Sequence, residues 1–491
     1  MTRKEIFIDQ IHELHKLSEA MSLAVFESGA DVYRYAETLV KVDRGTGRAK
    51  TRPLSVEAFR HEVSKSAVCL VDRKQKDGGT FKVEVYPPQT ACRDAIAGGD
   101  WPFHELVGLI RHPSITENGE LIISEGYDKK TGLFVDTAGM APNIPESPTR
   151  SEVDAARDTI LEPLIDFPFT ERADVANAVA LFLSVLCRPM IRGAVPIFGI
   201  LAPAPGTGKT LLVDALLTPI TGDVPSKLTE TRDSDELQKT LVAALLESPE
   251  ALIIDNLNSR IDSGIIASIS TTGRLKGRIL GHSEVVDIPV SAPFILTANN
   301  PQASSEITRR IVPVKLSANT DKPWMRENFR HPALVEYVKE NRGSLISAGL
   351  TLARAWVVAG KPKPKGKRLG SFESWVFTIG GILEFAGLPG FLDNCDDFHS
   401  TADEETVRWE SFAKRWQSEK GIYPVNTSEL IELALHCEVI EEGRTHRGTV
   451  TALGRALGKM QDRVFSNLKI KRAGIVSGLQ LWKVEELEQQ V

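Results

Sequence analysis

Long hydrophobic runs and paired cysteines are both missing from this sequence of 491 residues. The longest apolar run, Ala178–Cys187, is about half the length that a membrane-spanning helix needs, and the amino terminus lacks the apolar core of a signal peptide. The five cysteines show no Cys-X-X-Cys spacing, which argues against a zinc ribbon and against a disulfide framework. These absences predict a soluble, cytoplasmic protein that has no membrane contact.

An excess of positive charge is also lacking, because the formal net charge is −6 and the pI is near 6.0. The chain as a whole is therefore not attracted to nucleic acid, and any DNA or RNA binding must come from local basic surface. The length predicts about three domains of ordinary size.

A Gly-rich turn within Leu201–Thr210 is the strongest local signal in the chain. It lies between an apolar run of strand composition and a run of helix composition. Gly206 and Gly208 let backbone N–H groups face a polyphosphate, and the following helix adds the positive end of its dipole. Lys209 is expected to reach the terminal phosphates and the Thr210 hydroxyl to bind Mg²⁺. The stretch predicts a strand, a phosphate-binding loop and a helix.

The turn departs from the phosphate-loop consensus at one position. Pro203 stands where the consensus has Gly, five residues before Gly208, and it stiffens the entry to the loop. The alternative interpretation is a Gly-rich turn that Lys and Thr follow by chance. On the phosphate-loop interpretation the nucleotide is held by Pro205, Gly206, Thr207, Gly208, Lys209, Thr210 and Leu211.

A candidate metal-binding carboxylate ends the apolar strand Ala251–Asp255. At the carboxyl edge of a parallel sheet Asp255 can hold Mg²⁺ through water, although an Asp in this position can also simply cap a turn. The next residue is Asn256, which cannot accept a proton as a catalytic base. Either hydrolysis is slow or another carboxylate supplies this function, and the candidates are Glu230, Asp233 and Asp262.

Three later stretches carry polar or basic residues. Two apolar-alternating runs within Arg274–Pro289 predict a hairpin with a basic tip and base. Asn299 ends a further strand, where an amide beside a nucleotide positions water or senses the γ-phosphate. Arg309 and Arg310 precede another strand, and an arginine that reaches a neighbouring subunit's site stabilises transition-state charge. The plain alternative for these arginines is an ordinary ion pair.

The element pattern predicts an α/β protein with four parts. Residues 1–145 form an α+β accessory domain that opens with a helix through Glu19, and residues 146–360 form the domain of the Gly-rich loop with a helical lid. Residues 361–370 are a basic linker, and residues 371–491 end in winged-helix order: helix, helix, hairpin. A winged helix also serves protein contacts. Its expected DNA-binding residues are Arg455, Lys459, Arg463, Lys471 and Arg472.

The ordered set of these motifs resembles the AAA+ ATPases, and more narrowly the superfamily 3 and minichromosome-maintenance-like ring helicases. The chain looks most like the replicative helicases of prophages, plasmids and mobile cassettes. The likeness covers the chain from about His112 to its carboxyl terminus. Besides the arginine pair, it is carried by Gly126–Leu133, Arg278–Gly281, Thr297–Pro301 and Ser371–Leu383.

This resemblance implies an AAA+ P-loop ATPase core, ATP and Mg²⁺ as cofactors, and a hexameric ring that binds ATP between subunits. It implies a nucleotide-sensing Asn299, a trans-acting Arg310 or Arg309, and a hairpin with Lys276 and His282 that faces DNA in a central channel. The catalytic set is then Lys209, Asp255, Asn256, Asn299, Arg309 and Arg310. We expect a ring-forming DNA helicase of a mobile element; the alternatives are an initiator or loader without processive unwinding and a nucleotide-gated DNA-binding regulator.

Overall fold

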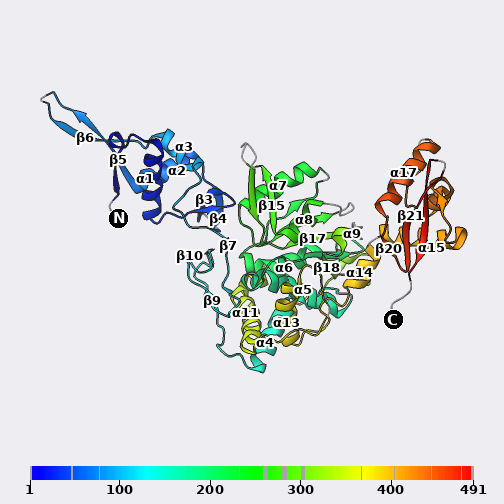
Figure 1. The fold of residues 1–491 in the computed structure, drawn as a ribbon. Helices are drawn as coiled ribbons and strands as arrows, with labels where there is room; N and C mark the ends of the chain where they lie inside the picture. The colour runs from blue at the N-terminus through cyan, green and yellow to red at the C-terminus, as the bar shows by residue number, and fades with distance from the viewer. Residues whose placement is uncertain are drawn as a thin grey trace. The chain divides into compact units, whose positions relative to one another are not determined.

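The computed structural model describes residues 3–45, 48–76, 78–231, 233–257, 264–278, 285–299, 305–366, 368–402, 404–443, 445–476 and 478–487. Contacts divide the chain into two compact units (Figure 1). The first comprises Met1–Asn258, Ser263–Asn300 and Arg310–Asp393, and the second comprises Ser259–Asp262, Pro301–Arg309 and Asn394–Val491. No helix among the described residues has both the length and the apolar character that crossing a membrane requires.

The amino-terminal part of the first unit is an α+β assembly with two three-stranded sheets, ordered β1-β5-β6 and β2-β3-β4. Its opening is a strand, Lys4–Phe7, in which Ile6 is buried at 3% exposure, and the helix expected through Glu19 begins only at Leu14. Ser55 caps α2, and its hydroxyl accepts from the Ala58 N–H at 3.1 Å. The elements are β1 (Lys4–Phe7), η1 (Ile8–Gln10), α1 (Leu14–Glu27), β2 (Val32–Tyr35), β3 (Thr38–Asp43), β4 (Lys50–Pro53), α2 (Val56–Ser66), β5 (Ala67–Lys74), β6 (Thr80–Val85) and α3 (Gln89–Ala97).

Short strands follow this assembly, with turns near residues 118 and 130. They are β7 (Gly108–Ile110), β8 (Ser114–Ile115), β9 (Leu121–Ile122), β10 (Gly126–Asp128) and β11 (Leu133–Val135). The amino-terminal part is joined to the core through the end of the later helix α7. The Tyr35 hydroxyl donates to the Leu245 carbonyl at 3.2 Å, and the Thr51 hydroxyl donates to the Leu246 carbonyl at 2.6 Å.

A five-stranded parallel sheet in the order β13-β14-β17-β12-β18 forms the centre of the first unit. Strand β12 is buried along its whole length, as expected for a strand covered on both faces. Helix α5 packs against β18 and α6, and it contains most of the apolar run of residues 178–187. Because the strands are parallel, the carboxyl ends of β12, β14 and β17 meet at one edge.

The elements of this core are α4 (Arg150–Leu161), η2 (Glu162–Leu164), α5 (Arg172–Leu186), η3 (Arg188–Met190), β12 (Ile197–Ala202), α6 (Lys209–Thr221), β13 (Leu228–Thr229), α7 (Ser234–Leu246), β14 (Leu252–Leu257), α8 (Gly264–Thr272), β15 (Arg274–Arg278), β16 (Val285–Pro289), β17 (Phe294–Asn299) and β18 (Ile311–Lys315). They are followed by η4 (Pro323–Met325), α10 (Leu334–Glu340), α11 (Arg342–Val358), α12 (Glu373–Trp375), the π-helix η5 (Val376–Gly380) and α13 (Gly381–Phe385).

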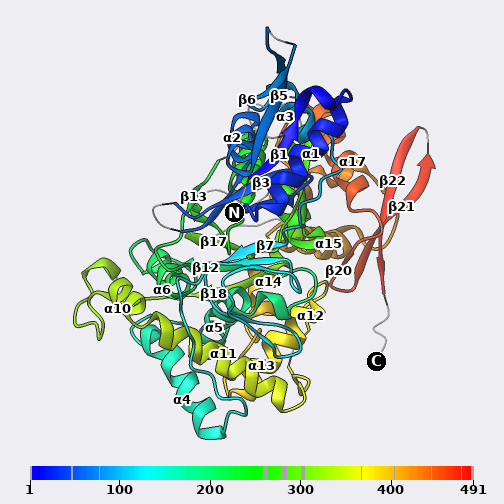
Figure 2. The same ribbon diagram turned by 90° about the vertical axis from the view of Figure 1, so that its left-hand side faces the viewer.

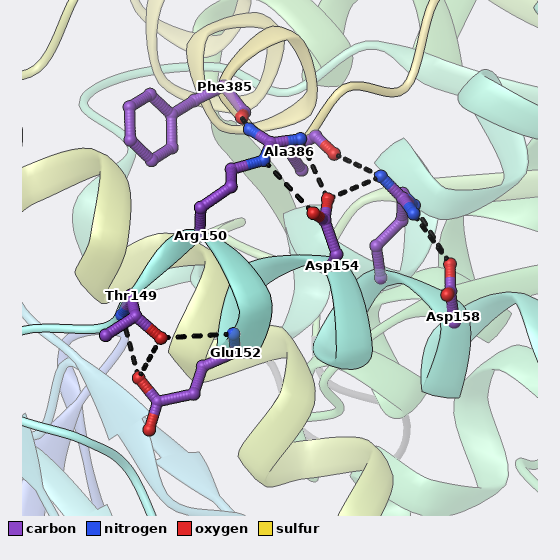
Figure 3. Close-up of polar contacts among 8 residues, drawn as sticks. Thr149, Arg150, Glu152, Asp154, Asp158, Phe385 and Ala386 are labelled. Atoms are coloured by element: carbon purple, nitrogen blue, oxygen red, sulfur yellow. Dashed lines mark hydrogen bonds and ion pairs between the residues drawn. The ribbon is translucent and has the colours of Figure 1, made fainter.

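The boundary predicted at residue 371 is wrong, because the first unit extends to Asp393. Trp375 is fully buried in this unit, and its indole N–H donates to the Ser184 hydroxyl of α5 at 2.7 Å. In Figure 3, Arg150 of α4 reaches the end of α13, where its guanidinium donates to the Phe385 carbonyl at 2.8 Å. Residues 371–393 therefore complete the core of the first unit.

The second unit contains the predicted succession of helices followed by a hairpin. Its sheet has the order β19-β22-β21-β20, and β21 and β22 form the long hairpin seen in Figure 2. Phe412, Trp416, Leu457 and Trp482 are among its buried core residues. The elements are α9 (Ser305–Thr308), α14 (Cys395–Ala402), α15 (Glu404–Lys420), β19 (Val425–Asn426), η6 (Thr427–Leu430), α16 (Ile431–His436), α17 (His446–Lys459), β20 (Val464–Phe465), β21 (Leu468–Val476) and β22 (Leu479–Glu486).

Candidate functional site

The Gly-rich loop joins β12 to α6 at the carboxyl edge of the sheet, so the predicted strand, turn and helix are confirmed. Gly206 and Gly208 have φ angles of +76° and +100°, in the left-handed region that Gly adopts without strain. The Thr207 hydroxyl donates to the Ala204 carbonyl at 2.7 Å and closes the loop. No side chain of the described residues caps the start of α6, so its first N–H groups face outward to an anion or to water.

Lys209, the first residue of α6, lies against the neighbouring strand. It is 7% exposed, and its Nζ donates to the Asn299 Oδ1 at 2.6 Å. The register of β12 and β17 pairs Ala202 with Asn299, which sets both residues at the same edge. Burial lowers the pKa of Lys209, while the carboxylate of Asp255 acts in the opposite direction. A largely buried ammonium group favours an anionic partner, and a polyphosphate is such a partner.

Asp255 binds two threonine hydroxyl groups at this edge. The Thr210 hydroxyl donates to its Oδ1 at 3.0 Å, and the Thr297 hydroxyl donates to the same oxygen at 2.5 Å. Thr297 in turn accepts from the backbone N–H of Asn256 at 2.7 Å. A chain of hydrogen bonds therefore joins α6, β17 and β14 and fixes the orientation of the carboxylate.

The Thr210 hydroxyl and the Asp255 carboxylate fit Mg²⁺, because both are hard oxygen donors on facing elements. Among the residues that the structure describes, no group of three or more His, Cys, Asp or Glu could hold a metal by itself. A Mg²⁺ that takes most of its ligands from water and phosphate does not require such a group.

Asn256 follows Asp255 in a β-bulge. The register between β14 and β17 shifts between Ile254 and Leu257, and Asn256 has a φ of +58°. Asn tolerates this left-handed conformation better than most residues, and a bulge re-aims side chains beside a site. The amide side chain nevertheless cannot act as a base.

The structure separates the three carboxylates considered as alternative bases. Asp233 caps α7, since its Oδ1 accepts from the N–H groups of Asp235 and Glu236 at 2.8 and 3.2 Å. Glu230 directly follows Thr229, which is the register partner of Asp255, so Glu230 lies at the edge of the candidate site. Asp262 is outside the described residues.

A cavity with a volume of about 350 Å³ adjoins the Gly-rich loop. Its walls come from the loop, from residues 163–167 and from residues 323–336. A Cβ atom on Gly206 would lie 3.1 Å from the Trp324 Cβ, and one on Gly208 would lie 3.4 Å from the Phe167 ring. His331 also lines the cavity and stacks on Tyr337 with ring centroids 3.7 Å apart. Sequence reasoning missed this aromatic wall, because no local motif marks residues brought together from such distant segments.

Arg310 lies at the opposite edge of the sheet from Lys209. It directly precedes β18, and its carbonyl accepts from the Ile197 N–H at 2.9 Å, at the amino end of β12. The length of the parallel strands therefore separates Arg310 from the Gly-rich loop of the same chain. Arg309 is exposed and belongs to the second compact unit.

The predicted basic hairpin is formed by β15 and β16, with Lys276 opposite Asp287. The Lys276 side chain is 77% exposed, and its Nζ lies 3.7 Å from the Asp287 carboxylate. A Cβ atom on Gly277 would meet Val242 of α7 at 2.4 Å, so Gly permits the hairpin to pack closely on that helix. His282 and the rest of the tip lie outside the described residues.

The five basic residues predicted in the second unit fall into two groups. Arg455 and Lys459 are exposed one turn apart on α17 and make no ion pair with the described residues. The other three have partners within the unit: Arg463 contacts Met460 and Thr406, Lys471 pairs with Glu485, and Arg472 lies over the Trp482 ring.

No protein-family model matches the chain, and no curated protein matches it. Solved structures are similar to it at low identity, and three of them are described next. The apo A form of the NrS-1 C-terminal region has a TM-score of 0.41 and 10% identity over 95% of this chain and 99% of that chain. The active helicase Cch of SCCmec type IV has a TM-score of 0.35 and 11% identity over 93% and 97%. The JCV helicase has a TM-score of 0.23 and 15% identity over 48% and 67%.

Proposed function

We propose that this chain is a Mg²⁺-dependent ATPase that forms a ring and translocates on DNA, as the replicative helicase of a mobile element. The observation that carries this proposal is the convergence of Lys209, Thr210, Asp255 and Asn299 at one edge of a parallel sheet, beside an uncapped helix start. An ammonium group, a hydroxyl, a carboxylate and an amide in this arrangement suit a nucleoside triphosphate with its metal.

In this proposal, the N–H groups of the Gly-rich loop bind the phosphates and Lys209 meets the terminal phosphate. Bound Mg²⁺ would neutralise phosphate charge, with Thr210 and Asp255 as its protein partners. Asn299 aligns the Lys209 ammonium group, and the cavity beside Phe167 and Trp324 accommodates the base. This cavity lies within the range of small-ligand sites, near its lower limit.

Three features support a ring that acts on DNA. Arg310 is remote from the loop of its own subunit, which suits an arginine that completes the site of a neighbour in a hexamer. Exposed cations on the β15–β16 hairpin and on α17 suit contacts with DNA phosphates. Winged-helix order in the second unit suits duplex binding, while the hairpin suits a single strand in the channel.

A nucleotide-gated DNA-binding regulator is the second candidate, and Asn256 is the observation that favours it. Without a base beside Asp255, nucleotide binding would drive assembly while turnover remained slow. An initiator or loader that remodels DNA without processive unwinding shares the same site.

The test is ATP hydrolysis by the full chain with and without single-stranded DNA. The variant Lys209→Ala should abolish turnover, and inactive Arg309→Ala or Arg310→Ala subunits should poison wild-type activity in mixtures. DNA-stimulated hydrolysis with poisoning supports the ring motor, and strand displacement then separates a helicase from a loader. Slow, DNA-indifferent turnover without poisoning refutes the motor and supports the regulator.

A further inference from the structure

The hairpin of β5 and β6 projects from the amino-terminal assembly. Strand β1 pairs only with Ala67–Leu70 of β5, so beyond Leu70 the hairpin is a ribbon of two strands. Both views of the molecule show it extending past α1, α2 and α3 (Figures 1 and 2). Residues 72–76 and 78–82 are all exposed. A ribbon that buries so little of itself contributes little to the core, which indicates a role outside the fold.

The far end of this ribbon is basic in a chain of net negative charge. Arg73, Lys74 and Lys76 are exposed, and within the part of the chain that the structure describes their side chains form no ion pair or hydrogen bond. Lys82, nearer the base, is different, because its Nζ lies over the Phe7 ring at 4.2 Å. Three cations that lack an internal partner are available to an external anion.

The register distributes these cations over both faces of the ribbon. Arg73 pairs with Phe81, which is 44% exposed, so these two side chains share one face. Lys74 pairs with Thr80 on the opposite face, because side chains alternate along a strand. Lys76 lies in the turn beyond them. If the ribbon bound single-stranded DNA by stacking bases on an aromatic side chain, its cations would be expected on one face. A groove of duplex DNA has phosphates along both of its walls, and cations on both faces of the ribbon can reach them.

The dimensions of the ribbon also favour a groove in duplex DNA. Two strands lie about 4.8 Å apart, and the major groove, about 12 Å wide and about 8.5 Å deep, admits a two-stranded β-ribbon. At about 3.3 Å per residue, the segment from Val71 to the turn exceeds the depth of the groove. We propose that the β5–β6 hairpin is a DNA-binding arm that enters the major groove of duplex DNA and contacts its phosphates with Arg73, Lys74 and Lys76.

This arm goes beyond the proposed ATPase, because its contacts require neither nucleotide nor a ring. It gives the amino-terminal part of the chain a role in holding duplex DNA. The binding is expected to be independent of sequence, since phosphate contacts carry no base information directly.

The test measures binding of the nucleotide-free full chain to a fluorescent mixed-sequence duplex over a range of salt concentrations. The triple variant R73A/K74A/K76A should bind more weakly than the wild type. Its slope of log K against log salt should be shallower by about 2 to 3, because each lost phosphate contact removes about 0.9. The matched control K16A/K129A/K130A also removes three exposed positive charges and should keep the wild-type slope.

Two outcomes would overturn the arm. An unchanged salt slope in the triple variant would exclude these residues from DNA contact. A loss of affinity for a single strand with full retention of duplex affinity would exclude the groove. Equal melting temperatures and equal DNA-free ATP hydrolysis in both triple variants establish that folding and the ATP site are intact. The variant Lys209→Ala tests the ATPase proposal separately from the arm, because it should abolish turnover and leave duplex binding unchanged.

Discussion

Lys209, the first residue of α6, donates to Asn299, the last residue of β17, in a hydrogen bond of 2.6 Å. The contact couples the ammonium group beside the Gly-rich loop to the amide at the end of β17. A phosphate that binds Lys209 must therefore either share the ammonium group with Asn299 or break its hydrogen bond to Asn299. Either response links occupancy of the site to the position of β17.

The first prediction concerns this amide. Asn299→Ala removes the acceptor that aligns Lys209, and we expect kcat for ATP to fall about 100-fold, with a smaller change in KM. Steady-state kinetics measures both constants. Asn299→Asp is the matched variant, because its carboxylate keeps an acceptor and adds a negative charge near the phosphates. Asn299→Asp should therefore raise the KM for ATP. Wild-type kinetics in both variants would show that Asn299 is not part of the ATP site.

The second prediction concerns the chain of hydrogen bonds at Asp255. Thr297→Val keeps the shape of a side chain that is 1% exposed but removes the hydroxyl that donates to Asp255. We expect the Mg²⁺ concentration for half-maximal hydrolysis to rise about tenfold, since partners of metal ligands tune metal affinity to this extent. Asp255→Asn should raise it further. A Mg²⁺ titration with unchanged midpoints would contradict the assignment of Asp255 to the metal.

The sequence was informative where a motif is local. The Gly-rich loop, the strand ending at Asp255 and the strand ending at Asn299 each carry their own signal within a few residues, and one edge of a parallel sheet brings them together. The burial of Trp375 against α5 depends on partners about 190 residues away, so the boundary at 371 could not be corrected from local composition. The cavity wall of Phe167 and Trp324 was missed for the same reason.

The third prediction concerns the catalytic base that Asn256 cannot supply. Glu230 lies at the edge of the site by its register, while Asp233 is used as a helix cap. If Glu230 activates the attacking water, Glu230→Gln should lower kcat by a factor of about 100 or more and leave ATP binding intact. Asp233→Asn is the control, because an amide oxygen still caps α7. Single-turnover hydrolysis and nucleotide binding are measured on the same variants. ATP hydrolysis by Glu230→Gln at the wild-type rate would contradict the assignment.

The fourth prediction is structural. Arg342 donates to the Pro219 carbonyl at 2.6 Å and to the Ile220 carbonyl at 3.2 Å, and so satisfies the carboxyl end of α6. Arg342→Ala should lower the free energy of unfolding by about 1.5 to 3 kcal/mol, the usual range for hydrogen bonds to a charged group. Urea denaturation of the variant measures this loss. The KM for ATP should stay constant, and a changed KM with unchanged stability would instead make Arg342 a nucleotide contact.

The last prediction tests the cavity beside the loop. Trp324 is 62% exposed and packs on Gly206, where it is available to a nucleobase. Stacking of a base on an aromatic side chain contributes about 1 to 3 kcal/mol, so Trp324→Ala should raise KM for ATP at least several-fold. Because the base takes no part in phosphate cleavage, kcat should change little. Trp324→Phe keeps an aromatic face and should retain most of the affinity. Binding of a fluorescent ATP analogue and of inorganic triphosphate separates the two contributions: only the analogue should bind more weakly to Trp324→Ala. Equal weakening of both ligands would mean that Trp324 supports the Gly-rich loop and does not contact the base.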